Sequence, residues 1–263
     1  MSPVLAIVLG NSTAAAALAV DDSLTAVRRM PVTQLDGLHE LLARGCPDSS
    51  EAWPIIVASV NPPALERLRQ LVAEMSLPAP AVAGVDFPIP VKTDLKEPER
   101  IGTDRLLGAL AAYRRTKGPC IVVDCGTATT VNAVSQDGTF LGGAILPGPE
   151  LMARALAEGT AQLPEVQIGP VASAIGKSTE EAILAGIIHG WRGAVWSLIE
   201  GISDTTRPMP SVVLTGGGLE ALLTEHLRSA LADPAADPRP VRLFVDDLVL
   251  EGLVIAYREW QGR

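Results

Sequence analysis

A strand–turn–strand unit that occurs twice is the feature that most restricts how this chain can fold. Placing Gly10 on Gly126 aligns the stretch PVLAIVLGNSTAAAALAVDD with PCIVVDCGTATTVNAVSQDG. In each copy an apolar, β-branched run predicts a buried strand, a turn of small and hydroxyl-bearing residues follows, and a second β-prone segment comes next. The repeat therefore predicts two related lobes, each opened by one copy of the unit.

The turn of the second copy, GTATT at residues 126–130, follows the strand that carries Asp124. Backbone N–H groups in such a turn can bind phosphate oxygens, and a carboxylate beside them can hold a cation that neutralises the phosphates. A plain hairpin with an aspartate at its end has the same pattern, so for this segment alone both interpretations stay open. In the first copy Val8 occupies the position of Asp124.

Size and charge limit the classes of protein that remain. The 263 residues suffice for one large domain or two of moderate size, and 48% of them are apolar. A net charge of −9 argues against nucleic acid or an anionic membrane as a partner, but it does not oppose binding of ATP. Without a signal sequence or an apolar run of about 18 residues, the chain is expected to be a soluble cytoplasmic protein.

The cysteines and histidines do not form a metal-binding pattern. The cysteines lack zinc spacing and are expected to be buried or free thiols: Cys46, Cys120 and Cys125. The histidines are scattered over predicted helices and are expected to be structural or surface residues: His39, His189 and His226.

Strands and helices alternate along the chain. In the first half, strands are expected at residues 5–9, 14–20, 24–30, 55–60 and 81–83, and helices at 34–44 and 64–75. In the second half, strands are expected at 120–123, 131–134, 139–145, 211–215 and 241–245, and helices at 150–158, 180–202, 219–231 and 247–260. The order predicts α/β layers in which the first three strands form an antiparallel meander. We place an N-terminal lobe at residues 1–116 and a C-terminal lobe at 117–263.

The motif GTDR, residues 102–105, is expected to open a helix near Thr103. Asp104 would lie in the first turn, where the helix dipole favours its charged form. One interpretation is structural, with Asp104 complementing the dipole and Arg105 solvated. In the other, Asp104 accepts a proton from a substrate hydroxyl and Arg105 binds a substrate carboxylate through two hydrogen bonds.

The stretch IGKST at residues 175–179 is only partly similar to a phosphate-binding P-loop. A P-loop needs a glycine five positions before Gly176 and a preceding strand, whereas Val171 stands there and residues 169–174 read as a loop. We expect Ser178 or Thr179 to cap the helix that follows, with a ligand contact of Thr179 as the alternative. The three glycines 216–218 favour either a tight turn or the close approach of a base or ribose.

Six motifs, in chain order, resemble those of the type III pantothenate kinases: GNST, GTDR, DCGTATT, GGAILPG, IGKST and LTGGG. The similarity runs from Leu5 to the last helix, and GTDR is among its most specific parts. That family belongs to the superfamily of acetate kinase, the sugar kinases and actin. The resemblance therefore implies an α/β fold of two ribonuclease-H-like lobes around an ATP cleft. Each lobe would hold a mixed sheet with an antiparallel three-stranded meander, flanked by helices.

The resemblance also implies an activity and roles for single residues. The family phosphorylates pantothenate with ATP, uses Mg²⁺ and a monovalent cation (K⁺ or NH₄⁺), and forms homodimers. Asp104 matches the general base, and Asp124 matches the carboxylate that holds the monovalent cation. The implied pantothenate site comprises Gly102, Thr103, Asp104, Arg105 and Thr179. The implied ATP-phosphate site comprises Gly10, Asn11, Ser12, Thr13, Gly126 and Thr127, and Gly216 and Gly217 would lie by the adenosine.

Two positions depart from the family pattern. The family writes its first turn as D-x-G-N-[ST], and here Val8 replaces the aspartate; Leu95 stands where a tyrosine is frequent. Asp21, Asp22 or a water molecule could take over the missing carboxylate's role. The departure at Val8 leaves a second hypothesis open, a paralogue that binds nucleotide without catalysing phosphoryl transfer. For the active enzyme, we expect Asp104 and Asp124 to face a single crevice between the lobes.

Overall fold

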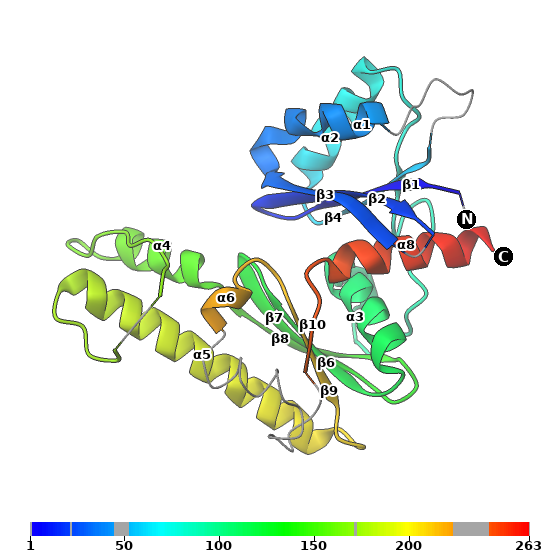
Figure 1. The fold of residues 1–263 in the computed structure, drawn as a ribbon. Coiled ribbons are helices and arrows are strands. Elements are labelled where there is room, and N and C mark those ends of the chain that lie inside the picture. The colour runs from blue at the N-terminus through cyan, green and yellow to red at the C-terminus, as the bar shows by residue number, and fades with distance from the viewer. Residues whose placement is uncertain (1, 22, 45–52, 171–172, 223–241, 263) are drawn as a thin grey trace. The chain divides into compact units, whose positions relative to one another are not determined.

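The computed structural model describes residues 2–21, 23–44, 53–170, 173–222 and 242–262. The chain forms two compact units, one of Met1–Arg115 with Asp247–Arg263 and one of Thr116–Asp246. Each is built on a five-stranded mixed sheet flanked by helices (Figure 1). The predicted fold class is confirmed. The structure counts the last seventeen residues with the first unit, whereas the predicted lobes kept residues 247–263 with the second.

The first unit holds the strands β1 (Val4–Leu9), β2 (Thr13–Val20), β3 (Ser23–Pro31), β4 (Ile55–Ser59) and β5 (Ala81–Val82). They lie in the order β3-β2-β1-β4-β5. Strands β1, β2 and β3 form the predicted antiparallel meander, whereas β4 runs parallel to β1 and β5 parallel to β4. The carboxyl ends of β1 and β4 therefore lie at the same edge of the sheet.

The second unit repeats this sheet strand for strand. Its strands are β6 (Cys120–Cys125), β7 (Ala128–Val134), β8 (Phe140–Pro147), β9 (Ser211–Thr215) and β10 (Arg242–Phe244). The order β10-β9-β6-β7-β8 has β6 in the place of β1, with an antiparallel neighbour on one side and a parallel neighbour on the other. The duplication inferred from the aligned segments is thus present in the three-dimensional topology.

The two hairpins differ in the length of their turns. Leu9 pairs with Ala14 in the first, so four residues connect the last paired positions, whereas Cys125 pairs with Thr129 in the second and three residues connect them. The first turn therefore contains one peptide group more than the second.

Helices cover both faces of the first sheet (Figure 1). The 3₁₀ segment η1 (Val32–Leu38) and the helices α1 (His39–Arg44) and α2 (Pro62–Glu74) bury leucines against one face. The other face packs against α3 (Thr103–Thr116) and the closing helix α8 (Leu248–Gln261). A short 3₁₀ turn, η2 (Pro98–Arg100), precedes α3. Because α8 shares this core with β1 and β4, it belongs to the first unit.

The second unit contains the helices α4 (Pro149–Gly159) and α5 (Thr179–Thr205), and the described residues also include Leu219–Leu222 of α6. Among the described residues one helix, α5, is long and apolar enough to cross a membrane by length and composition alone. Trp191 of α5 is fully buried, and its indole N–H donates to Thr129 Oγ1 of β7 at 2.9 Å. A core helix passes the same test, so α5 is only a weak indication of a membrane span.

Three sequence predictions change or fall outside the described residues. The helix predicted at 34–44 is a 3₁₀ segment up to Leu38 and an α-helix only from His39, and the 3₁₀ segment is kinked at Gln34, which has φ −117° and ψ 40°. Of the helix predicted at 219–231, the described part ends at Leu222. Cys46 and His226 lie outside the described residues, whereas Cys120 and Cys125 are the buried free thiols that were expected.

Candidate active site

The GTDR motif lies at the beginning of α3, as predicted. The backbone N–H of Arg105 donates to Asp104 Oδ1 at 2.8 Å, and Thr103 Oγ1 donates to the carbonyl of Ser59 at 3.4 Å. The motif is therefore fixed at the carboxyl end of β4. A Cβ on Gly102 would lie 2.5 Å from Asp104 Oδ1, so any side chain at this position would displace the carboxylate.

Burial sets the protonation chemistry of Asp104 and Arg105. Burial raises the pKa of the Asp104 carboxyl, opposed by the Arg105 backbone N–H and the Arg105 charge. Burial likewise lowers the pKa of the Arg105 guanidinium, and the negative charge of Asp104 opposes that shift. A carboxylate whose pKa is raised is a better proton acceptor, and an arginine keeps its charge despite such a shift. The pair can therefore act as a base next to a fixed cation.

The GNST motif forms the turn between β1 and β2, and its carbonyls are held in place. The Thr13 carbonyl accepts from the Gly10 N–H, and the Ser12 carbonyl accepts from the Val32 N–H, both at 2.9 Å. The carbonyls of Gly10 and Asn11 accept from Asn61 Nδ2 at 3.3 and 3.4 Å. The turn follows β1 directly, so GNST and GTDR lie at the same edge of the first sheet.

Sequence reasoning missed Ser59 and Asn61, which connect the two motifs. Ser59 ends β4 and accepts a hydrogen bond from Thr103 of GTDR, and Asn61 donates to the GNST turn two residues later. Asn61 also caps α2, because its Oδ1 accepts the Ala64 N–H at 3.1 Å. An asparagine just before Pro62 signals a helix cap. No local pattern signals its bond to a turn about fifty residues earlier.

Val8 lies among apolar residues. It pairs with Ala15 of β2 and Ala58 of β4 and packs beside the core that α3 and α8 cover. Asp21, considered above as a replacement carboxylate, follows β2 and lies at the opposite end of the hairpin. About eight strand residues, or roughly 25 Å, separate it from the GNST turn. Asp21 therefore cannot replace the missing carboxylate, and Asp22 lies outside the described residues.

In the second unit Asp124 lies one residue before the end of β6, next to Thr130 and Thr215 on the flanking strands. The turn that follows is covered by the start of α4. The N–H of Gly148 donates to the Thr127 carbonyl at 2.9 Å, and a Cβ on Gly148 would lie 2.2 Å from the Gly126 carbonyl oxygen. The end of β6 and the start of α4, both in the second unit, thus bring together Asp124, Gly126 and Thr127.

The three glycines after β9 have different reasons to be glycine. Gly216 has φ +98°, and a Cβ there would lie 2.5 Å from Asp124 Oδ1. The N–H of Gly218 donates to the Cys125 carbonyl at 2.7 Å, and a Cβ on Gly218 would lie 3.0 Å from that carbonyl oxygen. Gly217 is exposed, and a Cβ there would meet nothing within 4 Å. The turn therefore accounts for Gly216 and Gly218, and Gly217 is the one whose lack of a side chain is not explained by local packing.

Thr179 is the first residue of α5 and is exposed. The helix cap is Ser178, whose Oγ accepts the Glu181 N–H at 3.2 Å, while Glu181 Oε2 accepts the Lys177 N–H at 2.6 Å. The side chain of Thr179 is thus not needed for capping. A P-loop needs a strand directly before it, and the described residues 160–170 and 173–178 contain none. The structure therefore agrees with the rejection of a P-loop at residues 175–179.

The donor atoms around Asp124 suit a hard cation that also contacts phosphate. The described residues contain no group of three or more histidine, cysteine or acidic side chains that could enclose a metal ion. A cation beside a triphosphate can be bound by one carboxylate, by neighbouring oxygen atoms and by the phosphates themselves. Asp124, at a strand end beside the Thr130 and Thr215 positions, offers oxygen ligands of that kind. The residues present therefore fit a cation that is completed by ATP.

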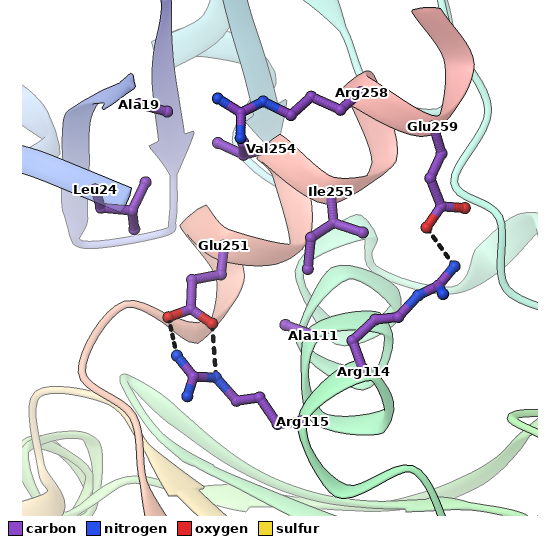
Figure 2. Close-up of a pocket in the computed structure, with 10 residues that line it drawn as sticks. All are labelled: Ala19, Leu24, Ala111, Arg114, Arg115, Glu251, Val254, Ile255, Arg258 and Glu259. Carbon is purple, nitrogen blue, oxygen red and sulfur yellow. Dashed lines mark hydrogen bonds and ion pairs between the residues drawn. The ribbon is translucent and has the colours of Figure 1, made fainter. Parts of the chain in front are cut away.

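A cavity of about 510 Å³ lies at the other end of α3 (Figure 2). Its acidic side chains are paired, since Arg115 Nε donates to Glu251 Oε2 at 2.8 Å and Arg114 is hydrogen-bonded to Glu259. Both pairs join α3 to α8. Ala111 of its wall is seven residues from Asp104, or about 10 Å along the helix. The cavity is thus separate from the GTDR and GNST motifs.

Comparison with solved structures identifies the fold. The activator of 2-hydroxyisocaproyl-CoA dehydratase from Clostridium difficile, solved with bound ADPNP, has a TM-score of 0.55 at 13% identity and covers 99% of this chain and 96% of its own. MreB 5 of Spiroplasma citri, solved with AMPPNP, has a TM-score of 0.51 at 11% identity and covers 100% and 98%. The fold is that of the actin-like ATPases and sugar kinases.

Sequence comparison defines the family. The family model for type III pantothenate kinase matches residues 4–201. The type III pantothenate kinase of Rhodospirillum rubrum is 38% identical over 207 residues, 78% of this chain and 76% of the relative. That of Syntrophotalea carbinolica is 33% identical over 225 residues, 86% of this chain and 84% of the relative. The chain belongs to the type III pantothenate kinase family.

Proposed function

We propose that this protein transfers the γ-phosphate of ATP to the 4′-hydroxyl of (R)-pantothenate, giving 4′-phosphopantothenate in the first step of coenzyme A biosynthesis. The observation that carries the proposal is the arrangement of the first unit. There a half-buried carboxylate with a raised pKa lies at the same sheet edge as a glycine-containing turn. Family membership supplies the identity of the substrates.

Asp104 is proposed as the general base. The pantothenate hydroxyl oxygen attacks the γ-phosphorus, the bond from that phosphorus to the β,γ-bridging oxygen breaks, and ADP leaves. The hydroxyl proton passes to the Asp104 carboxylate. Phosphoryl transfer has a loose transition state, so positioning and charge neutralisation contribute more than the strength of the base. A carboxylate fixed by the Arg105 N–H at 2.8 Å meets that requirement.

Arg105 is proposed to bind the pantothenate carboxylate through two parallel hydrogen bonds. Gly102 and Thr103 would line the same site, because they directly precede Asp104 and Thr103 is hydrogen-bonded to Ser59 at the end of β4. Thr179 is proposed as a further pantothenate contact, and its exposed side chain, which does not cap α5, supports this role.

The two turns are proposed to hold the ATP phosphates, with residues 10–13 contributing from one unit and Gly126 and Thr127 from the other. Asp124 would hold K⁺ or NH₄⁺, and Mg²⁺ would bind through the phosphates. These cations would supply charge neutralisation for the triphosphate. The exposed and sterically open backbone of Gly217 supports a position for the adenosine nearby.

The second hypothesis is a catalytically impaired paralogue that binds nucleotide or acts as a regulator. Val8 favours it, since a carboxylate at this position would help to organise metal and phosphates. Removing one electrostatic stabiliser of a transition state costs on the order of 10²-fold in rate. The intact GTDR and DCGTATT motifs favour the enzyme. A third candidate, another small-molecule kinase of the superfamily, is disfavoured by GTDR and is tested by a substrate panel.

A coupled assay of ADP release with pantothenate, ATP, Mg²⁺ and K⁺ separates these hypotheses. The proposal predicts pantothenate-dependent turnover in the wild type and none in Asp104→Asn, which preserves the shape of the side chain. No pantothenate-dependent turnover in either protein would leave only the nucleotide-binding hypothesis, and equal turnover in both would refute Asp104 as the base. Omitting pantothenate measures background ATP hydrolysis, and replacing K⁺ by Na⁺ tests the proposed monovalent cation.

We further propose that the protein is a cytoplasmic homodimer, as expected for this family. Sedimentation equilibrium at micromolar concentration tests the assembly. A species of twice the 27.5 kDa chain mass is the predicted result, and a monomer over the whole concentration range would refute the dimer.

A further inference from the structure

We infer that Asn61 is a positioning residue for the nucleotide: its side-chain amide orients two peptide groups of the GNST turn toward the phosphates of ATP. The inference rests on the proposed use of this turn as a phosphate site. It concerns a residue outside the motifs that identify the family. The contacts that carry it lie within the first unit.

The geometry of the peptide group gives the mechanism. A peptide unit is planar and trans, so the carbonyl of one residue and the N–H of the next point in opposite directions. Asn61 Nδ2 donates to the carbonyls of Gly10 and Asn11 at 3.3 and 3.4 Å. With both carbonyls directed toward Asn61, the N–H groups of Asn11 and Ser12 are directed away from it. Phosphate-binding turns use N–H groups arranged in this way.

Asn61 is itself held in a fixed orientation. Its Oδ1 accepts the Ala64 N–H at 3.1 Å, its backbone N–H donates to Ser59 Oγ at 3.1 Å, and its carbonyl accepts from Ser59 Oγ at 3.0 Å. Because Oδ1 faces the start of α2, Nδ2 is the atom left to face the turn. The asparagine thus connects the end of β4, the first turn of α2 and the GNST turn.

Comparison of the two units shows why the first needs this residue. In both, an N–H from the segment after the third strand holds a turn carbonyl: Val32 holds Ser12, and Gly148 holds Thr127. The first turn has one residue more, so a further peptide must be oriented. The strand that corresponds to β4 in the second unit is β9, and the three residues that follow it, Gly216, Gly217 and Gly218, have no side chain. In the first unit, the side-chain amide of Asn61 donates the hydrogen bonds that orient the peptide groups of the longer turn.

Two substitutions separate positioning from capping. Asn61→Ser keeps an oxygen that can cap α2, but its hydroxyl is too short to reach the turn. Asn61→Ala removes the cap and the donor together. Dissociation constants for Mg-ATP from calorimetry, melting temperatures, and KM values for ATP and pantothenate are measured on the full-length wild type and both variants.

We expect Mg-ATP binding to weaken by about tenfold in both variants, as for the loss of two weak neutral hydrogen bonds. The KM for ATP should rise in parallel, with the KM for pantothenate nearly unchanged. Only Asn61→Ala should also melt at a lower temperature. The inference is overturned if Asn61→Ser binds Mg-ATP like the wild type, or if weaker binding appears only where the melting temperature falls.

The binding measurement keeps this inference distinct from the proposed function. A wild type that binds Mg-ATP but does not phosphorylate pantothenate would refute the proposed reaction, and the ratio of dissociation constants would still decide the role of Asn61. A wild type that does not bind Mg-ATP would overturn both.

Discussion

The contact between α3 and α8 gives a prediction that links the fold to catalysis. A Cβ on Gly252 would lie 2.1 Å from the Leu107 carbonyl oxygen and 2.6 Å from its carbonyl carbon. Ordinary van der Waals contacts begin near 3.4 Å, so Gly252→Ala requires the helices to separate by about 1.3 Å. The contacting atoms are backbone, so no rotamer change can relieve the clash. The Arg114 and Arg115 ion pairs to α8 oppose the separation (Figure 2).

Two consequences follow from that displacement. Overpacking of this kind costs about 1–3 kcal/mol. For a chain of this size, a cost of about 2 kcal/mol lowers the melting temperature by roughly 4–8 °C. Asp104 lies three residues before Leu107 on the same helix. A shift of about 1 Å in a catalytic group can reduce turnover by about 10²-fold, so kcat should fall while the protein remains folded.

The matched control is Gly186→Ala on α5. Gly186 is also inside a helix, but a Cβ there would meet nothing within 4 Å. Both variants gain the same helix propensity, about 1 kcal/mol, so the difference between them isolates the close contact. Differential scanning calorimetry and the coupled assay provide the readouts. If Gly252→Ala melts and turns over like Gly186→Ala, the argument from helix contact is wrong.

Three further predictions follow from single residues. Because burial raises the pKa of Asp104 in the folded state, its contribution to stability decreases as pH rises from acid through that pKa. Thermal melts should therefore show Asp104→Asn gaining more stability relative to the wild type at pH 7 than at pH 4, and an equal gain at both would contradict this. Burial raises the pKa of Cys120 to about 11 and of Cys125 to about 12, so at pH 8 a thiol reagent should modify neither until denaturant is added. Peptide mapping checks this, and rapid native labelling of either would refute it. Val8→Asp should increase kcat by up to about 10²-fold if the first turn limits the rate, whereas an unchanged kcat would show that it does not.

The parts of the fold that could be predicted are those with local causes. Buried strands such as β1 and β6 appear as short apolar runs, and their internal similarity predicts that the two sheets share one topology. The start of α3 is likewise a local signal, because Thr103 and Asp104 suit a first helical turn. The same applies to the Ser178 cap of α5.

The parts that could not be predicted depend on contacts between distant segments. The apolar face of α8 shows that this helix is half-buried, but it does not show which sheet the helix covers. In the structure α8 shares its core with α3 and the first sheet, and its Gly252 lies against the backbone of Leu107 in α3. The bonds from Asn61 to the GNST turn cross fifty positions of sequence, so no periodicity reports them. In η1 the leucine spacing is helical, and the backbone angles at Gln34 break the helix nonetheless.

The central claim is that Asp104 takes the proton from the hydroxyl that receives the phosphate. A crystal structure of the protein with pantothenate and a non-hydrolysable ATP analogue tests it most directly. The account predicts a carboxylate oxygen of Asp104 about 2.6–3.2 Å from the pantothenate 4′-oxygen, with Asp124 near the triphosphate in the same crevice. Pantothenate bound away from Asp104, or the two carboxylates on separate surfaces, would contradict it.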